Sequence, residues 1–200
     1  LTGFKWIAKM IEDYPSQKFI VGGEESFGLM IGDEVRDKDA ITASLTAYEM
    51  MSYYKQNNSS VYKELIKLYC KYGFFKEKLV SIVKEGKEGQ IEIDNLIEKF
   101  RENPLTQIST SKVKYVIDYQ NSIRKNIITQ ELEIINLPVS NVIEFESVDG
   151  YKLIFRPSGT EPKIKMYISV NSKIKSISEF KKVNLILDKK LDKIAAQVNL

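Results

Sequence analysis

The segment Lys163–Val170 alternates without interruption between polar and apolar side chains, and this pattern constrains the fold more than any other part of the chain. Its apolar members are Ile164, Met166, Ile168 and Val170. A period of two residues is that of a β-strand whose two faces meet different surroundings. The segment therefore predicts a strand with one buried face, in a sheet that is covered on one side.

The rest of the second half supplies partners for this strand. Strands are expected over 74–84, 112–119, 142–147 and 151–155, where apolar and aromatic residues are frequent. Asp149-Gly150 is a hairpin signal between the last two of these. The segment Asn121–Leu137 is more polar and predicts irregular structure, while 84–89 predicts a solvated turn.

Two amphipathic helices are expected beside these strands. One carries a stripe made of Ile93, Leu96, Ile97 and Phe100. The last helix begins with a capping box formed by Ser176 and Glu179. Its apolar face consists of Ile177, Phe180, Val183, Leu187, Leu191, Ile194 and Val198. Antiparallel strands with helices on one side predict an α+β domain over 74–200.

The first 73 residues have a different order of elements. An amphipathic helix is expected to end before Pro15, followed by a strand over 18–22 and an extended piece over 29–32. Asp39 is expected to cap a long helix, and Ser60 the next one. This order predicts an α/β layer over 1–73. The chain begins without methionine and inside a helical pattern, so we expect a piece of a longer protein.

Composition excludes several classes of protein and site. The chain has no histidine, so it contains neither a Ser-His-Asp triad nor a histidine-ligated metal. Its single cysteine, Cys70, excludes an internal disulfide and suits a reducing compartment such as the cytoplasm. The net charge of +3 is too small and too dispersed to favour nucleic acid as a partner. No apolar run is long enough to predict a membrane span.

The polar loop Arg156–Pro162 is a candidate phosphate-binding site. Arg156 offers a fork of donors, and Ser158 and Thr160 add hydroxyl groups. Gly159 is expected to adopt a positive φ and to turn backbone N–H groups inward as an anion nest. Glycine, serine and proline are also the usual residues of a hairpin turn, and that alternative stays open at this point.

Two further stretches are candidates in the first part of the chain. Glu24, Glu25 and Ser26 lie in a glycine-bounded loop, where they can hydrogen-bond vicinal sugar hydroxyls or form an ordinary solvated surface. Lys38 lies just before the helix that Asp39 caps, near the positive end of its dipole, and is a candidate proton donor. A charged first turn without a catalytic role is the alternative for this stretch.

Together these stretches resemble the α-D-phosphohexomutase family, which includes phosphoglucomutases and phosphomannomutases. The resemblance rests on four segments in the family's order: Thr2-Gly3-Phe4-Lys5, Gly23-Glu24-Glu25-Ser26-Phe27-Gly28, Arg36-Asp37-Lys38-Asp39, and Arg156-Pro157-Ser158-Gly159-Thr160-Glu161-Pro162. It implies that 1–73 is the end of the family's third domain and that 74–200 comprises a connector and the fourth domain.

The resemblance also implies roles for individual residues. Thr2, Gly3, Glu24, Ser26 and Arg36 are implied to contact the sugar, and Lys38 to assist proton transfer. The implied phosphate ligands are Arg156, Ser158, Gly159 and Thr160, which hold the phosphate that is not being transferred.

The implied reaction interconverts hexose 1-phosphate and hexose 6-phosphate through a phosphoserine and a bisphosphorylated intermediate, glucose 1,6-bisphosphate in a phosphoglucomutase. The phosphoserine and the Mg²⁺ loop belong to the family's first two domains and have no counterpart here, so we expect the fragment to be inactive without the N-terminal domains of its parent chain. The Glu-Glu-Ser-Phe-Gly form of the sugar loop favours a phosphoglucomutase. The alternatives are a phosphomannomutase or phosphopentomutase fragment and a non-catalytic sugar-phosphate-binding module.

Overall fold

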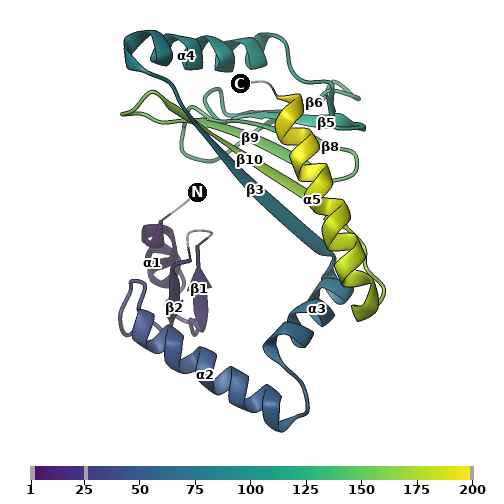
Figure 1. Ribbon diagram of the computed structural model, residues 1–200. Helices are drawn as coiled ribbons and strands as arrows, with labels where there is room; N and C mark the ends of the chain where they lie inside the picture. Colours follow the sequence, from purple (N-terminus) through teal and green to yellow (C-terminus); the bar gives the residue numbers. More distant parts are fainter. Residues whose placement is uncertain (1–2, 25–26, 199–200) are drawn as a thin grey trace. The chain divides into compact units, whose positions relative to one another are not determined.

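The computed structural model describes residues 3–24 and 27–198 (Figure 1). Contacts between residues divide the chain into two compact units, Leu1–Leu65 and Ile66–Leu200. The helix α3 (Val61–Tyr72) contains the division between them. No helix in the described parts of the chain is both long and apolar enough to cross a membrane.

The unit Leu1–Leu65 consists of α1 (Phe4–Asp13), a hairpin of β1 (Val21–Gly23) and β2 (Leu29–Ile31), and α2 (Ala40–Gln56). The hairpin strands are antiparallel, with Gly22 opposite Met30. The predicted end of α1 before Pro15 is confirmed, whereas the strand predicted over 18–22 starts later, at Val21.

Both predicted helix caps in the first part of the chain are confirmed. The carboxylate of Asp39 accepts hydrogen bonds from the backbone N–H groups of Ile41 and Thr42, at 2.9 and 3.3 Å, at the start of α2. The hydroxyl of Ser60 accepts from the N–H of Lys63 at 3.2 Å, at the start of α3. These side chains satisfy donors that the first turn of a helix leaves without partners.

The unit Ile66–Leu200 is built on one antiparallel sheet. Its strands are β3 (Phe74–Val83), β4 (Gln107–Ile108), β5 (Ser111–Asp118), β6 (Ile123–Asn126), β7 (Leu132–Ile134), β8 (Ile143–Ser147), β9 (Lys152–Pro157) and β10 (Lys163–Ser172). Their order in the sheet is β3-β10-β9-β8-β5-β6-β7, and β4 pairs with β5. Two helices accompany the sheet, α4 (Gly86–Glu102) and α5 (Phe180–Gln197), and a 3₁₀ turn at Ile177–Glu179 precedes α5.

The core of this unit lies between one face of the sheet and helices α4 and α5, and Ile66 of α3 also belongs to it (Figure 1). The alternation in β10 is confirmed, because all its predicted inward-facing side chains are buried, at 0 to 1% exposure. Helix α4 contributes Ile93, Ile97 and Phe100, and the Phe100 ring stacks on that of Phe155 at 4.5 Å between centroids. The predicted α+β architecture of the second part is therefore confirmed.

Three local predictions for this unit are wrong. The segment Asn121–Leu137 contains the hairpin of β6 and β7, closed by Asn126, whose side chain accepts from the N–H groups of Ile128 and Thr129. Its strands are short and largely exposed, so their composition resembles that of a loop. The turn predicted over 84–89 is shorter, because α4 already begins at Gly86.

The third wrong prediction is the capping box before α5. The hydroxyl of Ser176 pairs with that of Ser178 at 2.9 Å and makes no capping bond to the helix. The carboxylate of Glu179 accepts from the N–H of Lys175 at 2.9 Å, one residue before the expected donor. A 3₁₀ turn therefore occupies the place where the first α-helical turn was predicted.

We expect the Leu191→Ala variant to lower the free energy of unfolding by about 2–5 kcal/mol, because Leu191 is 2% exposed and its removal leaves a cavity in the core. The matched control is Leu185→Ala in the same helix, where the side chain is 61% exposed and the loss should stay below about 1 kcal/mol. Urea unfolding followed by circular dichroism measures both. Equal losses would contradict the assigned packing of α5.

Candidate functional site

The segments singled out in the first part of the chain meet around the ring of Phe4. Gly3 precedes α1 with a φ of 112°, in the region that favours glycine, and Phe4 is buried behind it. A Cβ on Gly28, at the end of the hairpin loop, would lie 2.6 Å from Cε2 of Phe4. The Nζ of Lys38 lies 5.7 Å from the centre of the same ring. Three stretches that are far apart in sequence are thus neighbours within this unit.

The hairpin loop that carries the predicted sugar ligands is closed by its backbone. The N–H of Glu24 donates to the carbonyl of Gly28 at 3.0 Å, and Glu24 is half-buried. Phe27 has a φ of 67° and is 99% exposed, so its ring faces solvent. The predicted ligands Thr2 and Ser26 and the neighbouring Glu25 lie outside the described residues.

The basic stretch before α2 is held by ion pairs. Arg36 pairs with Glu12 of α1, with 2.6 Å between Nη1 and Oε2. Lys38 pairs with its neighbour Asp37 at 3.1 Å, and its side chain is 62% exposed. Hydrogen bonds from the side chain and the N–H of Lys38 lower the pKa of Asp37, and the N–H of Ile41 lowers that of Asp39. Both carboxylates therefore stay charged in neutral solution.

The predicted phosphate loop joins β9 to β10. Arg156 lies opposite Lys165 across these two strands. The N–H of Ser158 donates to the carbonyl of Lys163 at 2.7 Å, which extends the ladder into the loop. The N–H of Lys84, at the end of β3, donates to the carbonyl of Pro162 at 2.8 Å and ties the loop to the neighbouring strand.

The backbone nest predicted for this loop is wrong in part. Gly159 does not have a positive φ, and a Cβ built on it would meet no atom within 4 Å. The N–H of Ser158 is engaged by the ladder, and the N–H of Thr160 donates to the hydroxyl of Ser158 at 3.4 Å. Anion binding by this loop would therefore depend mainly on side chains, above all on Arg156.

Two lysines that were not among the predicted phosphate ligands lie beside Arg156. Register and alternation place Lys163 and Lys165 on the same face of the sheet as Arg156, the face opposite the helices. Within the described residues, none of these three cations forms an ion pair with a carboxylate. The alternation in the sequence predicts that both lysines lie on the polar face of β10. Their proximity to Arg156 depends on the register of β9 against β10, which the sequence alone does not give.

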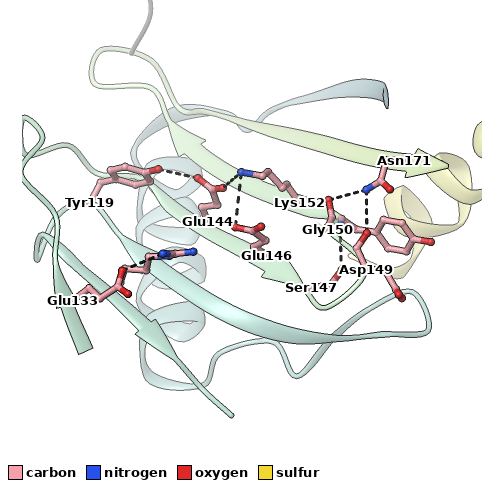
Figure 2. Close-up of polar contacts among 11 residues, drawn as sticks. Tyr119, Glu133, Glu144, Glu146, Ser147, Asp149, Gly150, Lys152 and Asn171 are labelled. Atoms are coloured by element: carbon pink, nitrogen blue, oxygen red, sulfur yellow. Dashed lines mark hydrogen bonds and ion pairs between the residues drawn. The ribbon is translucent and has the colours of Figure 1, made fainter. Parts of the chain in front are cut away.

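Farther along the same face, an acidic group is neutralised by its neighbours (Figure 2). Glu144 of β8 has a side chain that is 7% exposed; it accepts from the Tyr119 hydroxyl at 2.8 Å and pairs with Lys152 of β9 at 3.2 Å. Lys152 also lies 3.9 Å from the Glu146 carboxylate. Burial and the nearby Glu144 charge raise the pKa of Tyr119, which keeps the phenol protonated as a donor.

The residues described here do not fit a magnesium ion. Among them, no group of three or more aspartate, glutamate, cysteine or histidine side chains lies close enough together to hold a metal. The sequence-based assignment of Mg²⁺ to another part of the parent protein is not tested by this observation.

Comparison with known proteins connects the chain to one family. The model of the alpha/beta/alpha domain III of phosphoglucomutase/phosphomannomutase matches residues 1–69. Phosphoglucomutases of Staphylococcus epidermidis and Staphylococcus haemolyticus are 37% and 38% identical over 172 residues, or 86% of this chain. The Staphylococcus aureus phosphoglucomutase is 38% identical over 171 residues, or 85% of this chain. The chain spans 31% of the length of these curated relatives.

A solved structure shares the fold. The open form of pp63/parafusin, a phosphoglucomutase from Paramecium, aligns with a TM-score of 0.53 over 98% of this chain and 33% of that one, at 20% identity. Together with the domain match, it confirms the predicted fold class, an α/β part followed by an α+β part.

The Gly28→Ala variant should destabilise the unit Leu1–Leu65 by about 1–3 kcal/mol, because the added methyl meets the buried Phe4 ring. Fluorescence of Trp6, the single tryptophan and part of α1, reports on this unit during urea unfolding. Gly159→Ala, in the unit Ile66–Leu200, adds the same methyl in open space and should change stability by less than about 0.5 kcal/mol when its unfolding is followed by circular dichroism. A neutral Gly28→Ala would show that the ring does not pack against the loop.

Proposed function

Because this chain belongs to the α-D-phosphohexomutase family, we propose that it is the substrate-binding part of a phosphoglucomutase. The observation that carries this proposal is the set of cations at the β9–β10 loop: Arg156, Lys163 and Lys165 share one face, next to the hydroxyls of Ser158 and Thr160. The relatives named above are phosphoglucomutases, which favours glucose phosphate over mannose phosphate as the substrate.

The proposed phosphate site works through charge and hydroxyl donors. Arg156 is exposed and can present two N–H groups to two oxygens of one phosphate. Lys163 and Lys165 add positive charge and form no ion pair among the described residues, so no such pair has to break when an anion binds. Ser158, Gly159 and Thr160 complete the loop around the phosphate that is not transferred.

The proposed sugar site lies in the unit Leu1–Leu65. Glu24 and Ser26 would accept and donate hydrogen bonds with sugar hydroxyls, and Thr2 and Gly3 would approach the sugar from the start of α1. Arg36 would have to exchange its contact with Glu12 for a contact with ligand. The exposed ammonium of Lys38 is the candidate for assisting proton transfer.

The parent enzyme is proposed to interconvert glucose 1-phosphate and glucose 6-phosphate. Its phosphoserine, its Mg²⁺ and the site of its glucose 1,6-bisphosphate intermediate would involve the N-terminal domains of the same chain, and the boundary between the third domain and the rest would fall at 73/74. The residues described here would position the substrate, which is the main requirement of phosphoryl transfer. We propose a cytoplasmic enzyme with no nucleic-acid or membrane partner.

We expect Arg156→Ala to weaken binding of glucose 1-phosphate by about 1.5–3 kcal/mol, the usual worth of a charge-assisted hydrogen bond, or about 10- to 150-fold in the dissociation constant. Isothermal titration calorimetry measures the change. Lys181→Ala, which removes an exposed lysine of α5, should leave the affinity unchanged. An Arg156→Ala variant that is folded and binds normally would contradict the role of the loop.

We also expect these 200 residues alone not to convert glucose 1-phosphate, because substrate binding without the phosphoserine transfers no phosphoryl group. A coupled assay for glucose 6-phosphate, with Mg²⁺ and glucose 1,6-bisphosphate added, measures this, and the complete Staphylococcus aureus relative is the positive control. Turnover above the blank would disprove the expectation.

A further inference from the structure

Strand β3 lies at one end of the sheet, with β10 as its neighbour (Figure 1). It runs over 10 residues, and β10 covers its whole length on the inner side, from Phe74 opposite Ser172 to Val83 opposite Lys163. Among the described residues, no strand pairs with its outer side. A long, unpaired edge offers a row of hydrogen-bonding groups to another strand.

The hydrogen-bond pattern identifies which groups face outward. Lys84 donates to the carbonyl of Pro162, a pair that continues the register of β3 against β10. In an antiparallel ladder, residues alternate between bonding to one neighbour and pointing away from it. Even-numbered residues of β3 therefore bond to β10, and the outward-facing N–H and C=O groups are those of Phe75, Glu77, Leu79, Ser81 and Val83.

The side chains of these same residues lie on the face of the sheet opposite the helices. Phe75, Leu79 and Val83 are exposed by 58, 51 and 67%. They are spaced four residues apart and are symmetric about Leu79. Two copies of such a strand can pair antiparallel with apolar residues opposite one another, since Phe75 of one copy then lies opposite Val83 of the other and the two Leu79 residues lie opposite each other.

The lysines of β3 do not protect the edge. Lys76 and Lys78 point to the helix side, where Lys76 pairs with Asp188 at 2.5 Å and with the amide oxygen of Asn184 at 2.7 Å, and Lys78 pairs with Asp192 at 2.6 Å. Lysine at a sheet edge normally discourages a second strand from pairing. Here α5 neutralises both charges and draws them away from the outer side of β3.

We infer that β3 pairs antiparallel with β3 of a second copy of this chain, about a two-fold axis at Leu79. In this register Phe75 lies opposite Val83, Glu77 opposite Ser81, and Leu79 opposite its own copy. About ten backbone hydrogen bonds form between the copies, two for each outward-facing pair. The inference rests on the β3 edge alone and is independent of the proposed function.

The two neighbouring registers of this β3–β3 pair bring less favourable side chains opposite one another. Two residues that lie opposite each other must be on the same face of the sheet. The nearest alternative registers are therefore those in which the numbers of two opposed residues add up to two more or two less than in the register centred on Leu79. A shift one way places Phe75 opposite Ser81 and Glu77 opposite Leu79, and a shift the other way places Leu79 opposite Ser81 and Glu77 opposite Val83. The register centred on Leu79 puts apolar side chains opposite one another on the exposed face and keeps Glu77 away from them.

Sedimentation equilibrium of the full 200-residue chain tests the pairing. We expect the wild type to show a reversible equilibrium between monomer and dimer, and Leu79→Lys to raise the dimer dissociation constant at least about tenfold by opposing two ammonium groups. The matched control is Leu132→Lys on β7, the strand at the other end of the sheet, where the leucine is 65% exposed. It should leave the equilibrium unchanged.

Cysteine cross-linking in a Cys70→Ala background tests the register. Leu79→Cys should form a disulfide-linked dimer, because residues opposed in a hydrogen-bonded pair have Cα atoms about 5.5 Å apart, within reach of a disulfide. Glu77→Cys alone should not link to itself, whereas a mixture of the Glu77→Cys and Ser81→Cys chains should link as a heterodimer.

A wild-type chain that remains monomeric at every concentration reached would overturn the inference. So would equal effects of Leu79→Lys and Leu132→Lys, or a Glu77→Cys chain that links to itself as readily as Leu79→Cys. Circular dichroism checks that each variant is folded, which is expected because the substituted side chains at positions 79 and 132 are largely exposed.

Discussion

The one-sided burial of the antiparallel sheet is the constraint on which the unit Ile66–Leu200 depends. Helices α4 and α5 cover one face, and the alternation of each strand sorts its residues accordingly. Apolar side chains of β9 and β10 enter the core, while Arg156, Lys163 and Lys165 are left on the other face. The same sorting puts Phe75, Leu79 and Val83 on the outer face of β3. In this unit, the burial of the core and the exposure of Arg156, Lys163 and Lys165 thus follow from a single alternation.

Much of this architecture was predictable, because several strands and helices have a strong periodic pattern of apolar residues in the sequence. The strand Lys163–Val170, the stripe on α4 and the Asp39 cap all depend on local patterns and were confirmed. The β6–β7 hairpin was missed, since its short strands bury little and carry a weak apolar signal. The predicted capping box at the start of α5 was wrong because the Ser176 hydroxyl hydrogen-bonds to that of Ser178. Sequence spacing alone does not decide which of two competing hydrogen bonds forms.

The candidate sites were predictable only as stretches of sequence. The motifs indicated Arg156 and Lys38, but the ion pair of Arg36 with Glu12 joins residues 24 positions apart and has no local signal. Similarly, the placement of Lys165 opposite Arg156 depends on strand register, and the packing of Gly28 on Phe4 depends on how the hairpin meets α1. The ligand roles of Glu24, Ser26 and the phosphate loop remain predictions.

Strand β9 carries two cations on its exposed face in contrasting surroundings. Lys152 is paired with Glu144 and Glu146, whereas Arg156, beside Lys163 and Lys165, forms no ion pair within the part of the chain that the structure describes. At about 3.3 Å per residue the two cations are about 13 Å apart, more than the screening length of about 8 Å in physiological salt. The face is therefore electrically uneven, with its attraction for anions concentrated at the loop end. An approaching anion would be steered there, and its association rate would fall as ionic strength rises.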